Sequence, residues 1–143
     1  MKKDFIVSID QGTTSSRAIL FNLRGKPIYS SQKEFTQYFP KSGWVEHNPD
    51  EIWRTTLKTL KDVIKKVKKL RGEVLSIGIT NQRETTVLWD KKTGKPVYKA
   101  IVWQDRRQEE FCKKLRKLNK DTMIFNKTGL LIDSYFSGTK IKW

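Results

Sequence analysis

Cysteine is nearly absent from the sequence: Cys112 is the only one among 143 residues. An internal disulfide framework is therefore excluded, and the composition fits a reducing compartment. No apolar run approaches the roughly 18 residues that a membrane-spanning helix needs. The apolar run of residues 5–9 ends at Asp10 and is too short for a secretory signal peptide. These absences predict a cytoplasmic protein with no membrane partner.

Acidic residues are also scarce, since 15 Asp and Glu stand against 30 Lys and Arg, for a net charge of +15. Many lysines lie opposite the apolar positions of two expected helices, residues 49–71 and 106–118. Basic stripes of this kind occur in nucleic-acid-binding proteins. Lysine is equally a good helix former at solvated positions, and no nucleic-acid motif or exposed aromatic run accompanies it. Nucleic-acid binding is therefore the second hypothesis, and we expect no nucleic-acid partner.

The first half of the chain predicts a β-hairpin followed by a third strand and a helix. Residues 5–9 indicate a strand buried on both faces, and residues 17–22 and 27–35 its two antiparallel successors, with Gly25 in the second turn. Asn48 is the expected N-cap of the helix, with Pro49 at its first position and Glu51 completing a capping box. Gly72 is expected to end it. The expected apolar face of this helix comprises Trp53, Leu57, Leu60, Ile64 and Val67.

The second half predicts another buried strand, a hairpin and further helix. Residues 74–80 are almost wholly apolar, and residues 85–90 and 95–103 flank the turn sequence KKTG. Asp105 and Gln108 indicate a second capping box, so Asp105 is interpreted as a helix cap. The tail from residue 128 indicates a loop and the start of another helix. Together these elements predict one mixed α/β domain, in which His47 and Cys112 are structural.

The run SIDQGTTSSRAIL places small hydroxyl residues directly after the first strand. A tight turn containing Gly12, Thr13, Thr14 and Ser15 would direct backbone N–H and hydroxyl groups into one small space, which suits a phosphate. Arg17 would add positive charge. Asp10 at the end of a strand favours a nearby cation, and a hydrated Mg²⁺ would satisfy it. The alternative is an ordinary Ser/Thr-rich hairpin, and a Walker-type loop is excluded by its missing Gly-Lys-Ser/Thr ending.

Five blocks of the sequence resemble the FGGY carbohydrate kinases, and most closely those members that phosphorylate glycerol. The blocks are DQGTTSSRAI, GWVEHNPDEIW, IGITNQRETTVLWD, AIVWQDRR and TGLLIDSYFSGTKIKW. They follow the family's order and span almost the whole chain. The resemblance implies an α/β fold of the ribonuclease H-like type shared by actin and hexokinase, with a mixed sheet and flanking helices. It also implies ATP and Mg²⁺ as cofactors, with the hairpin turn on the ATP phosphates.

The same resemblance implies that Arg83 and Glu84 bind the glycerol hydroxyls, that Trp103 covers the carbon skeleton and that Tyr135 completes the pocket. A guanidinium paired with a carboxylate matches a polyol, whose hydroxyls both donate and accept. Without the family, the pair Arg83 and Glu84 would be interpreted as a surface ion pair, and Trp103 as core packing. A related FGGY kinase for another polyol or sugar remains an alternative.

In this family the catalytic base and the adenine pocket lie beyond the positions that correspond to residue 143. Residues 1–143 therefore correspond to part of the N-terminal kinase domain, without its C-terminal part and the second, nucleotide-binding domain. We expect the isolated chain to lack useful kinase activity, because loss of a general base alone costs about 10²–10⁴ in rate. Uncovered apolar surface is expected, and with it either a complementing C-terminal fragment or a homo-oligomer as partner.

Overall fold

The computed structural model describes residues 3–143, which divide into two compact units. Residues 3–36 and 48–82 form the first unit, and residues 37–47 and 83–143 the second. Across the described residues, no helix combines the length and apolar character needed to cross a membrane.

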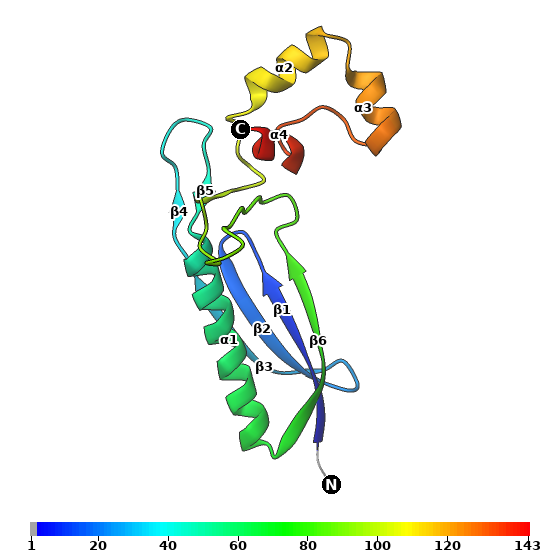
Figure 1. Ribbon diagram of the computed structural model, residues 1–143. Helices are drawn as coiled ribbons and strands as arrows, with labels where there is room; N and C mark the ends of the chain where they lie inside the picture. Colours follow the sequence, from blue (N-terminus) through cyan, green and yellow to red (C-terminus); the bar gives the residue numbers. More distant parts are fainter. Residues whose placement is uncertain (1–2) are drawn as a thin grey trace. The chain divides into compact units, whose positions relative to one another are not determined.

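The first unit is a four-stranded mixed sheet with one long helix against it (Figure 1). Strands β1 (Lys3–Gln11), β2 (Ser15–Asn22) and β3 (Pro27–Glu34) form an antiparallel meander, as predicted. Helix α1 (Pro49–Lys69) then returns the chain to β6 (Gly72–Asn81), which pairs in parallel with β1. The strand order is β3-β2-β1-β6.

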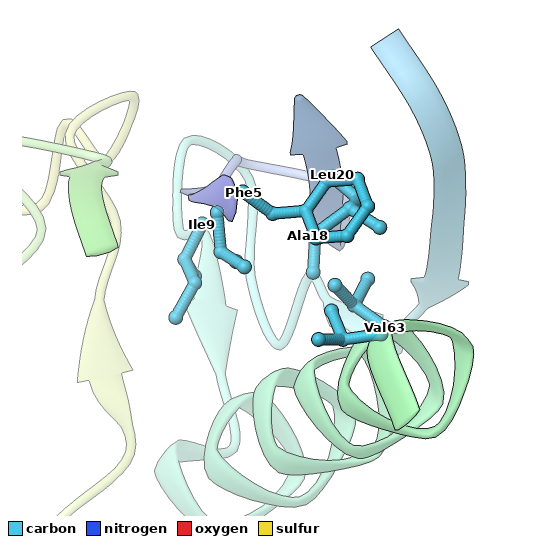
Figure 2. Close-up of a cluster of buried hydrophobic side chains, with 7 residues drawn as sticks. Phe5, Ile9, Ala18, Leu20 and Val63 are labelled. Atoms are coloured by element: carbon cyan, nitrogen blue, oxygen red, sulfur yellow. The ribbon is translucent and has the colours of Figure 1, made fainter. Parts of the chain in front are cut away.

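The core of this unit lies between α1 and one face of the sheet, where Figure 2 shows the cluster. Its buried members are Phe5, Val7, Ile9, Ala18, Leu20, Val63 and Val67. The prediction that β1 is buried on both faces was wrong, because burial alternates along the strand and Ile6 is 39% exposed. One helix covers one face of a sheet, so the residues of the opposite face keep solvent contact.

The start of α1 is partly as predicted. Asn48 is the N-cap, and its side-chain oxygen accepts a hydrogen bond from the amide of Asp50 at 3.0 Å. The Glu51 carboxylate was expected to complete a capping box. It instead accepts a hydrogen bond from the Thr36 hydroxyl at 3.0 Å. The predicted apolar face was wrong at Trp53, which is 61% exposed, because the buried residues of α1 are Thr59, Val63 and Val67.

Gly72 was expected to end α1, but the helix ends at Lys69, with Leu70 as its C-cap. A residue in the left-handed conformation, which is common after a helix, does follow. Arg71 takes that conformation, with φ of 54°, and Gly72 is the first residue of β6. A Cβ at Gly72 would lie 2.4 Å from Cε2 of Phe5 and 2.5 Å from the carbonyl oxygen of Lys3. Glycine is required here because β1 approaches too closely for any side chain.

Strand β6 exists as predicted, but its predicted burial was wrong. Leu75, Ile77 and Ile79 are 55%, 45% and 73% exposed. The register pairs Val7 with Ile77 and Ile9 with Ile79, so these isoleucines lie on the face of the sheet that α1 covers elsewhere. Strand β6 is the last strand in the order, and within residues 3–36 and 48–82 no further element covers these side chains.

The second unit contains a small antiparallel sheet and three helices. Its strands β4 (Gln37–Tyr38), β5 (Glu46–His47) and β7 (Ala100–Ile101) are arranged in that order. The predicted hairpin about KKTG is present as isolated bridges, Thr86 with Ile101 and Trp89 with Pro96. Helices α2 (Glu109–Lys117) and α4 (Ser137–Lys142) match expected helices, whereas α3 (Asp121–Thr128) was not predicted and has no buried residue.

Asp105 does not cap α2, contrary to the prediction. Gln108 is the N-cap and makes no side-chain capping bond. The Asp105 carboxylate is fully buried, where it accepts hydrogen bonds from the amide of Val45 at 2.7 Å and from the Arg107 guanidinium. Arg107 also bonds Glu46 at 2.8 Å, so a buried cation between two buried carboxylates fastens residues 45–46 to residues 105–107.

Strand β6 contains two glycines, Gly72 and Gly78, which allow a matched test of the close approach of β1 to Gly72. We expect Gly72→Ala to lower the free energy of unfolding by about 1–3 kcal/mol, because the new methyl group overlaps β1. Gly78→Ala in the same strand has open space around its Cβ and an ordinary φ, so it is expected to change stability by less than about 1 kcal/mol. Urea unfolding followed by circular dichroism measures both, and equal losses would contradict the close-approach explanation.

Candidate functional site

The turn between β1 and β2 is closed by its own backbone. The amide of Gly12 donates to the carbonyl oxygen of Ser15 at 3.0 Å. The Gly12 amide is therefore engaged within the turn in this structure. A Cβ at Gly12 would lie 3.2 Å from that carbonyl oxygen and 3.9 Å from Oδ1 of Asp10. The lack of a side chain at Gly12 thus keeps the tight turn open beside the Asp10 carboxylate.

The hydroxyl residues of the turn divide into two groups. Thr13 is half-buried and Thr14 is exposed at the tip. Ser15 is buried, and its hydroxyl accepts from Nε2 of Gln32 at 2.8 Å. Ser16 is fully buried and is hydrogen-bonded to the hydroxyls of two α1 residues, Thr55 and Thr56. The run of small residues therefore serves packing against α1 at one end and an accessible turn at the other.

Asp10 and Arg17 lie directly opposite each other on β1 and β2. Their side chains share one face of the sheet, because residues directly opposite in an antiparallel pair point the same way. That face is opposite to the buried pair Ile9 and Ala18. Nε of Arg17 is buried without a hydrogen-bond partner among the described residues. The end of the hairpin thus carries the half-buried Asp10 carboxylate next to the Arg17 guanidinium, whose Nε–H makes no hydrogen bond among the described residues.

A carboxylate, a cation and hydroxyls at one turn are the kinds of group that a magnesium–phosphate ligand requires. Within residues 3–143 no group of three or more metal-ligating side chains is present. Mg²⁺ does not require such a group, since it keeps several waters and is commonly held by one or two carboxylates together with substrate phosphates. Asp10 alone can fulfil the protein's share through water.

In the second unit, Glu84 is held by the start of α4. Its Oε2 accepts hydrogen bonds from the amide of Ser137 at 3.0 Å and from the Ser137 hydroxyl at 2.8 Å. Among the described residues, the other carboxylate oxygen of Glu84 has no hydrogen bond. The carboxylate is thereby fixed in orientation, with one oxygen available to accept from a ligand hydroxyl.

Trp103 and Tyr135 lie together in the same unit. Their ring centroids are 5.9 Å apart at 68°, an edge-to-face arrangement that aromatic pairs favour. The amide of Trp103 donates to the hydroxyl of Thr85, the residue after Glu84, at 3.3 Å. Trp103 is half-buried and Tyr135 is 37% exposed, so the pair offers an apolar wall, linked to Glu84 through its chain neighbour Thr85.

Within this unit Trp103 and Tyr135 are in direct contact. Glu84 is connected to them through neighbouring residues, by its hydrogen bonds to Ser137 and by the bond between Thr85 and Trp103. Arg83 is exposed and takes no part in these contacts. Sequence reasoning gave no role to Ser137, although the structure makes it the anchor of Glu84. The only sequence signal for it was its position two residues after Tyr135 at the start of an expected helix. A fixed carboxylate and an apolar aromatic pair in one unit are the kinds of group that line sites for small polar ligands.

His47 and Cys112 are structural in position, as predicted. Both side chains are fully buried. Burial raises the pKa of the Cys112 thiol above its ordinary value, assisted by the charge of Glu109. A raised pKa opposes thiolate formation, so Cys112 lacks the character of a nucleophile.

Comparison with known proteins identifies the family. The sequence profile of the FGGY family of carbohydrate kinases, N-terminal domain, matches residues 5–143. The chain belongs to the FGGY family of carbohydrate kinases. The glycerol kinase of Oceanobacillus iheyensis is 59% identical over the whole chain, and that of Bacillus mycoides is 57% identical over 141 residues, 99% of the chain. The chain spans 29% and 28% of the lengths of these relatives.

Solved structures agree with this assignment. The Plasmodium falciparum glycerol kinase with ADP matches 99% of the chain and 28% of its own length, with a TM-score of 0.93 and 38% identity. The gluconate kinase of Lactobacillus acidophilus matches 99% of the chain and 28% of its own length, with a TM-score of 0.90 at 20% identity, which shows a shared fold. The expected mixed-sheet fold of the actin and hexokinase type is confirmed.

Alanine substitutions distinguish the buried hydroxyl of Ser16 from the exposed hydroxyl of Thr14 by their effects on stability. Ser16→Ala is expected to lower the free energy of unfolding by about 1–2 kcal/mol, because the half-buried hydroxyls of Thr55 and Thr56 lose a partner at a fully buried position. Thr14→Ala at the exposed tip is expected to change it by less than about 0.5 kcal/mol. Chemical denaturation of both variants is the measurement. A larger loss at Thr14 than at Ser16 would contradict this division of roles.

Proposed function

We propose that the chain is the N-terminal part of a glycerol kinase, which transfers the γ-phosphoryl group of ATP to glycerol and yields ADP and sn-glycerol 3-phosphate. The observation that carries the proposal is the carboxylate of Glu84, fixed by Ser137 with one oxygen available, in the same unit as the Trp103–Tyr135 pair and linked to it through Ser137 and Thr85. Support also comes from the curated relatives at 57–59% identity, which are named glycerol kinases.

In the proposed complex, glycerol contacts four residues. Glu84 accepts from a glycerol hydroxyl through the oxygen that Ser137 leaves available. The exposed guanidinium of Arg83 donates to a hydroxyl oxygen, so that the two residues satisfy both hydrogen-bonding roles of the polyol. The edge of Trp103 and the ring of Tyr135 exclude water from the carbon skeleton, and the Tyr135 hydroxyl adds a polar contact.

The β1–β2 turn is the proposed site for the ATP phosphates. Thr13 and Thr14 offer donors at the tip, and Ser15 can donate its own hydroxyl hydrogen while accepting from Gln32. The unpartnered Nε of Arg17 is a further donor. Asp10 would hold Mg²⁺ through water, and the metal would neutralise developing charge on the phosphates. Gly12 contributes by leaving the turn free of a side chain.

The other requirements of the reaction fall to further parts of the enzyme. Phosphoryl transfer relies on positioning, charge stabilisation and a base near the attacking hydroxyl. The proposed roles of the described residues supply positioning and phosphate contacts. We therefore propose that residues 1–143 are inactive alone, and that the completed enzyme acts in the cytoplasm, where its ATP is supplied.

The uncovered side of β6 supports a complementing segment as the partner. Ile77 and Ile79 are apolar, exposed and aligned with the core positions Val7 and Ile9. A parallel strand is normally covered on both faces. The relatives are more than three times as long as this chain, since it spans 28–29% of them. We propose that the portion of the enzyme following the matched region covers these isoleucines.

Activity of a joined protein tests the function. Residues 1–143 are fused to the remaining part of the Oceanobacillus iheyensis glycerol kinase, and glycerol-dependent ADP release is measured, with longer polyols as competing substrates. We expect turnover with glycerol from the fusion and none from the isolated chain. Glu84→Gln should raise the KM for glycerol by about 10- to 100-fold, because a charged hydrogen-bond acceptor is lost.

The matched control is Glu110→Gln, at an exposed carboxylate on α2 that pairs with Lys113. It should leave the KM for glycerol within about twofold, as expected for an exposed ion pair. A fusion protein that folds and binds ATP but prefers a longer polyol would assign another FGGY substrate. No turnover with any polyol would overturn the proposed activity.

Complementation in trans tests the partner. The isolated chain is mixed with the remaining part of the same kinase as a separate polypeptide, and association is measured by light scattering after gel filtration. Ile77→Glu with Ile79→Glu should weaken association by at least tenfold, because two charges would be buried without partners. Leu23→Glu, at another exposed apolar side chain of the first unit, should have no such effect. Equal binding by both variants would contradict docking at β6.

A further inference from the structure

Lys140 is almost completely buried, with 2% of its surface exposed, on the short helix α4. Its Nζ donates a hydrogen bond to the carbonyl oxygen of Ser134 at 2.9 Å and another to the carbonyl oxygen of Tyr135. An ammonium has three donors and no acceptor, which suits it to hold carbonyl groups together. The residue thus connects α4 to the backbone that carries the Tyr135 ring.

The backbone of Tyr135 is held on both sides. Its amide donates to Oδ1 of Asp133 at 2.7 Å, and the same oxygen accepts from Nη1 of Arg106 at 3.0 Å. Its carbonyl oxygen accepts from Lys140. The Tyr135 side chain remains 37% exposed against Trp103. The Tyr135 ring is thus partly exposed while its backbone amide and carbonyl are both held, an arrangement that suits contact with a ligand.

The same helix holds the carboxylate of the site. Ser137 and Lys140 are three residues apart on α4, so their side chains are neighbours on one side of the helix. Ser137 fixes Glu84 through two hydrogen bonds, while Lys140 fixes Tyr135. Helix α4 therefore sets the spacing between a carboxylate and a phenol that come from distant parts of the sequence.

We propose that Lys140 is a positioning residue for polyol binding, which holds Tyr135, and through α4 Glu84, at the spacing that a small polyol requires. The inference rests on the proposed function and adds to it a residue that itself lies behind the site. Lys140 is a positioning residue because its Nζ is engaged by two backbone carbonyls and is withdrawn from solvent.

The chemistry of a buried ammonium supports this role over a purely stabilising one. Burial lowers the pKa of Lys140, although the negative charges of Glu84, Asp105 and Asp133 act in the opposite direction and Arg106 reinforces the lowering. Removing an ammonium from water is costly, and an apolar side chain of similar length is often equally stable in such a place. Lysine at this position is therefore explained by what it holds rather than by the stability it adds.

The first measurement uses the chain itself. Tyrosine is replaced biosynthetically by 3-fluorotyrosine, and the ¹⁹F resonance of Tyr135 is assigned among the four tyrosines with Tyr135→Phe. We expect Lys140→Met to shift or broaden the Tyr135 resonance and to leave that of Tyr29 unchanged. Lys142→Met, at an exposed lysine of the same helix, should change neither. Lys140→Gln, too short to reach both carbonyls, replaces Lys140→Met if that variant does not fold.

The second measurement uses the fusion with the rest of the kinase. Lys140→Met should raise the KM for glycerol by about tenfold or more, as expected when a binding group is displaced by a fraction of an ångström. The KM for ATP should stay within about twofold. Lys140→Arg keeps donors for both carbonyls and should recover most of the affinity for glycerol. Lys142→Met should match the unaltered fusion.

The outcomes separate this inference from the proposed function. An unaltered fusion without polyol-dependent turnover overturns the proposed function, while the ¹⁹F shift still decides whether Lys140 orders Tyr135. An unchanged Tyr135 resonance in folded Lys140→Met overturns the positioning role. Equal rises in the KM values for glycerol and ATP, with no recovery in Lys140→Arg, also overturn it, because they indicate general loss of structure.

Discussion

The packing of α1 against β1 and β2 is the interaction on which the first unit depends. Val63 and Val67 close the core over Phe5, Val7 and Leu20, and the burial of these side chains supplies the main favourable free energy of the sheet. The same contact fixes which face of the hairpin is interior. Ile9 and Ala18 must point toward α1, so Asp10 and Arg17 must point away from it. A constraint of packing thereby directs two charged groups to the end of the hairpin.

In the second unit, the comparable constraint is polar. Two buried cations carry it: Arg107 joins Asp105 to the distant Glu46, and Lys140 holds the carbonyls of residues 134 and 135 just before its own helix. Such bonds are directional, so each fixes a distance as well as a contact. Short helices and two-residue strands contribute little rigidity of their own. The spacing of Glu84, Trp103 and Tyr135 therefore follows from hydrogen bonds more than from regular secondary structure.

The differences between expectation and structure have identifiable physical causes. An apolar run such as residues 74–80 indicates a buried strand. The sequence does not reveal which element covers that strand, and β6 lies at the edge of this sheet. Asp105 has the residue type of a helix cap, yet a buried arginine two positions later attracts it more strongly. Gly72 was expected to end α1, but it begins β6, and glycine is needed there because of the ring of Phe5, which comes from a distant strand.

The sequence alone determined the hairpin, the start of α1 at Asn48 and the family, because these depend on local turn and capping chemistry or on motifs read in order. It also named the residues of both candidate sites. Tertiary structure decided that Ser16 serves packing, that the amide of Gly12 closes its own turn, and that Ser137 and Lys140 support Glu84 and Tyr135. The reason is that such hydrogen bonds leave no periodic pattern in the sequence, whether they join distant residues, as at Ser16 and Ser137, or nearby ones, as at Gly12 and Lys140. They become visible only when the backbone has brought their partners together.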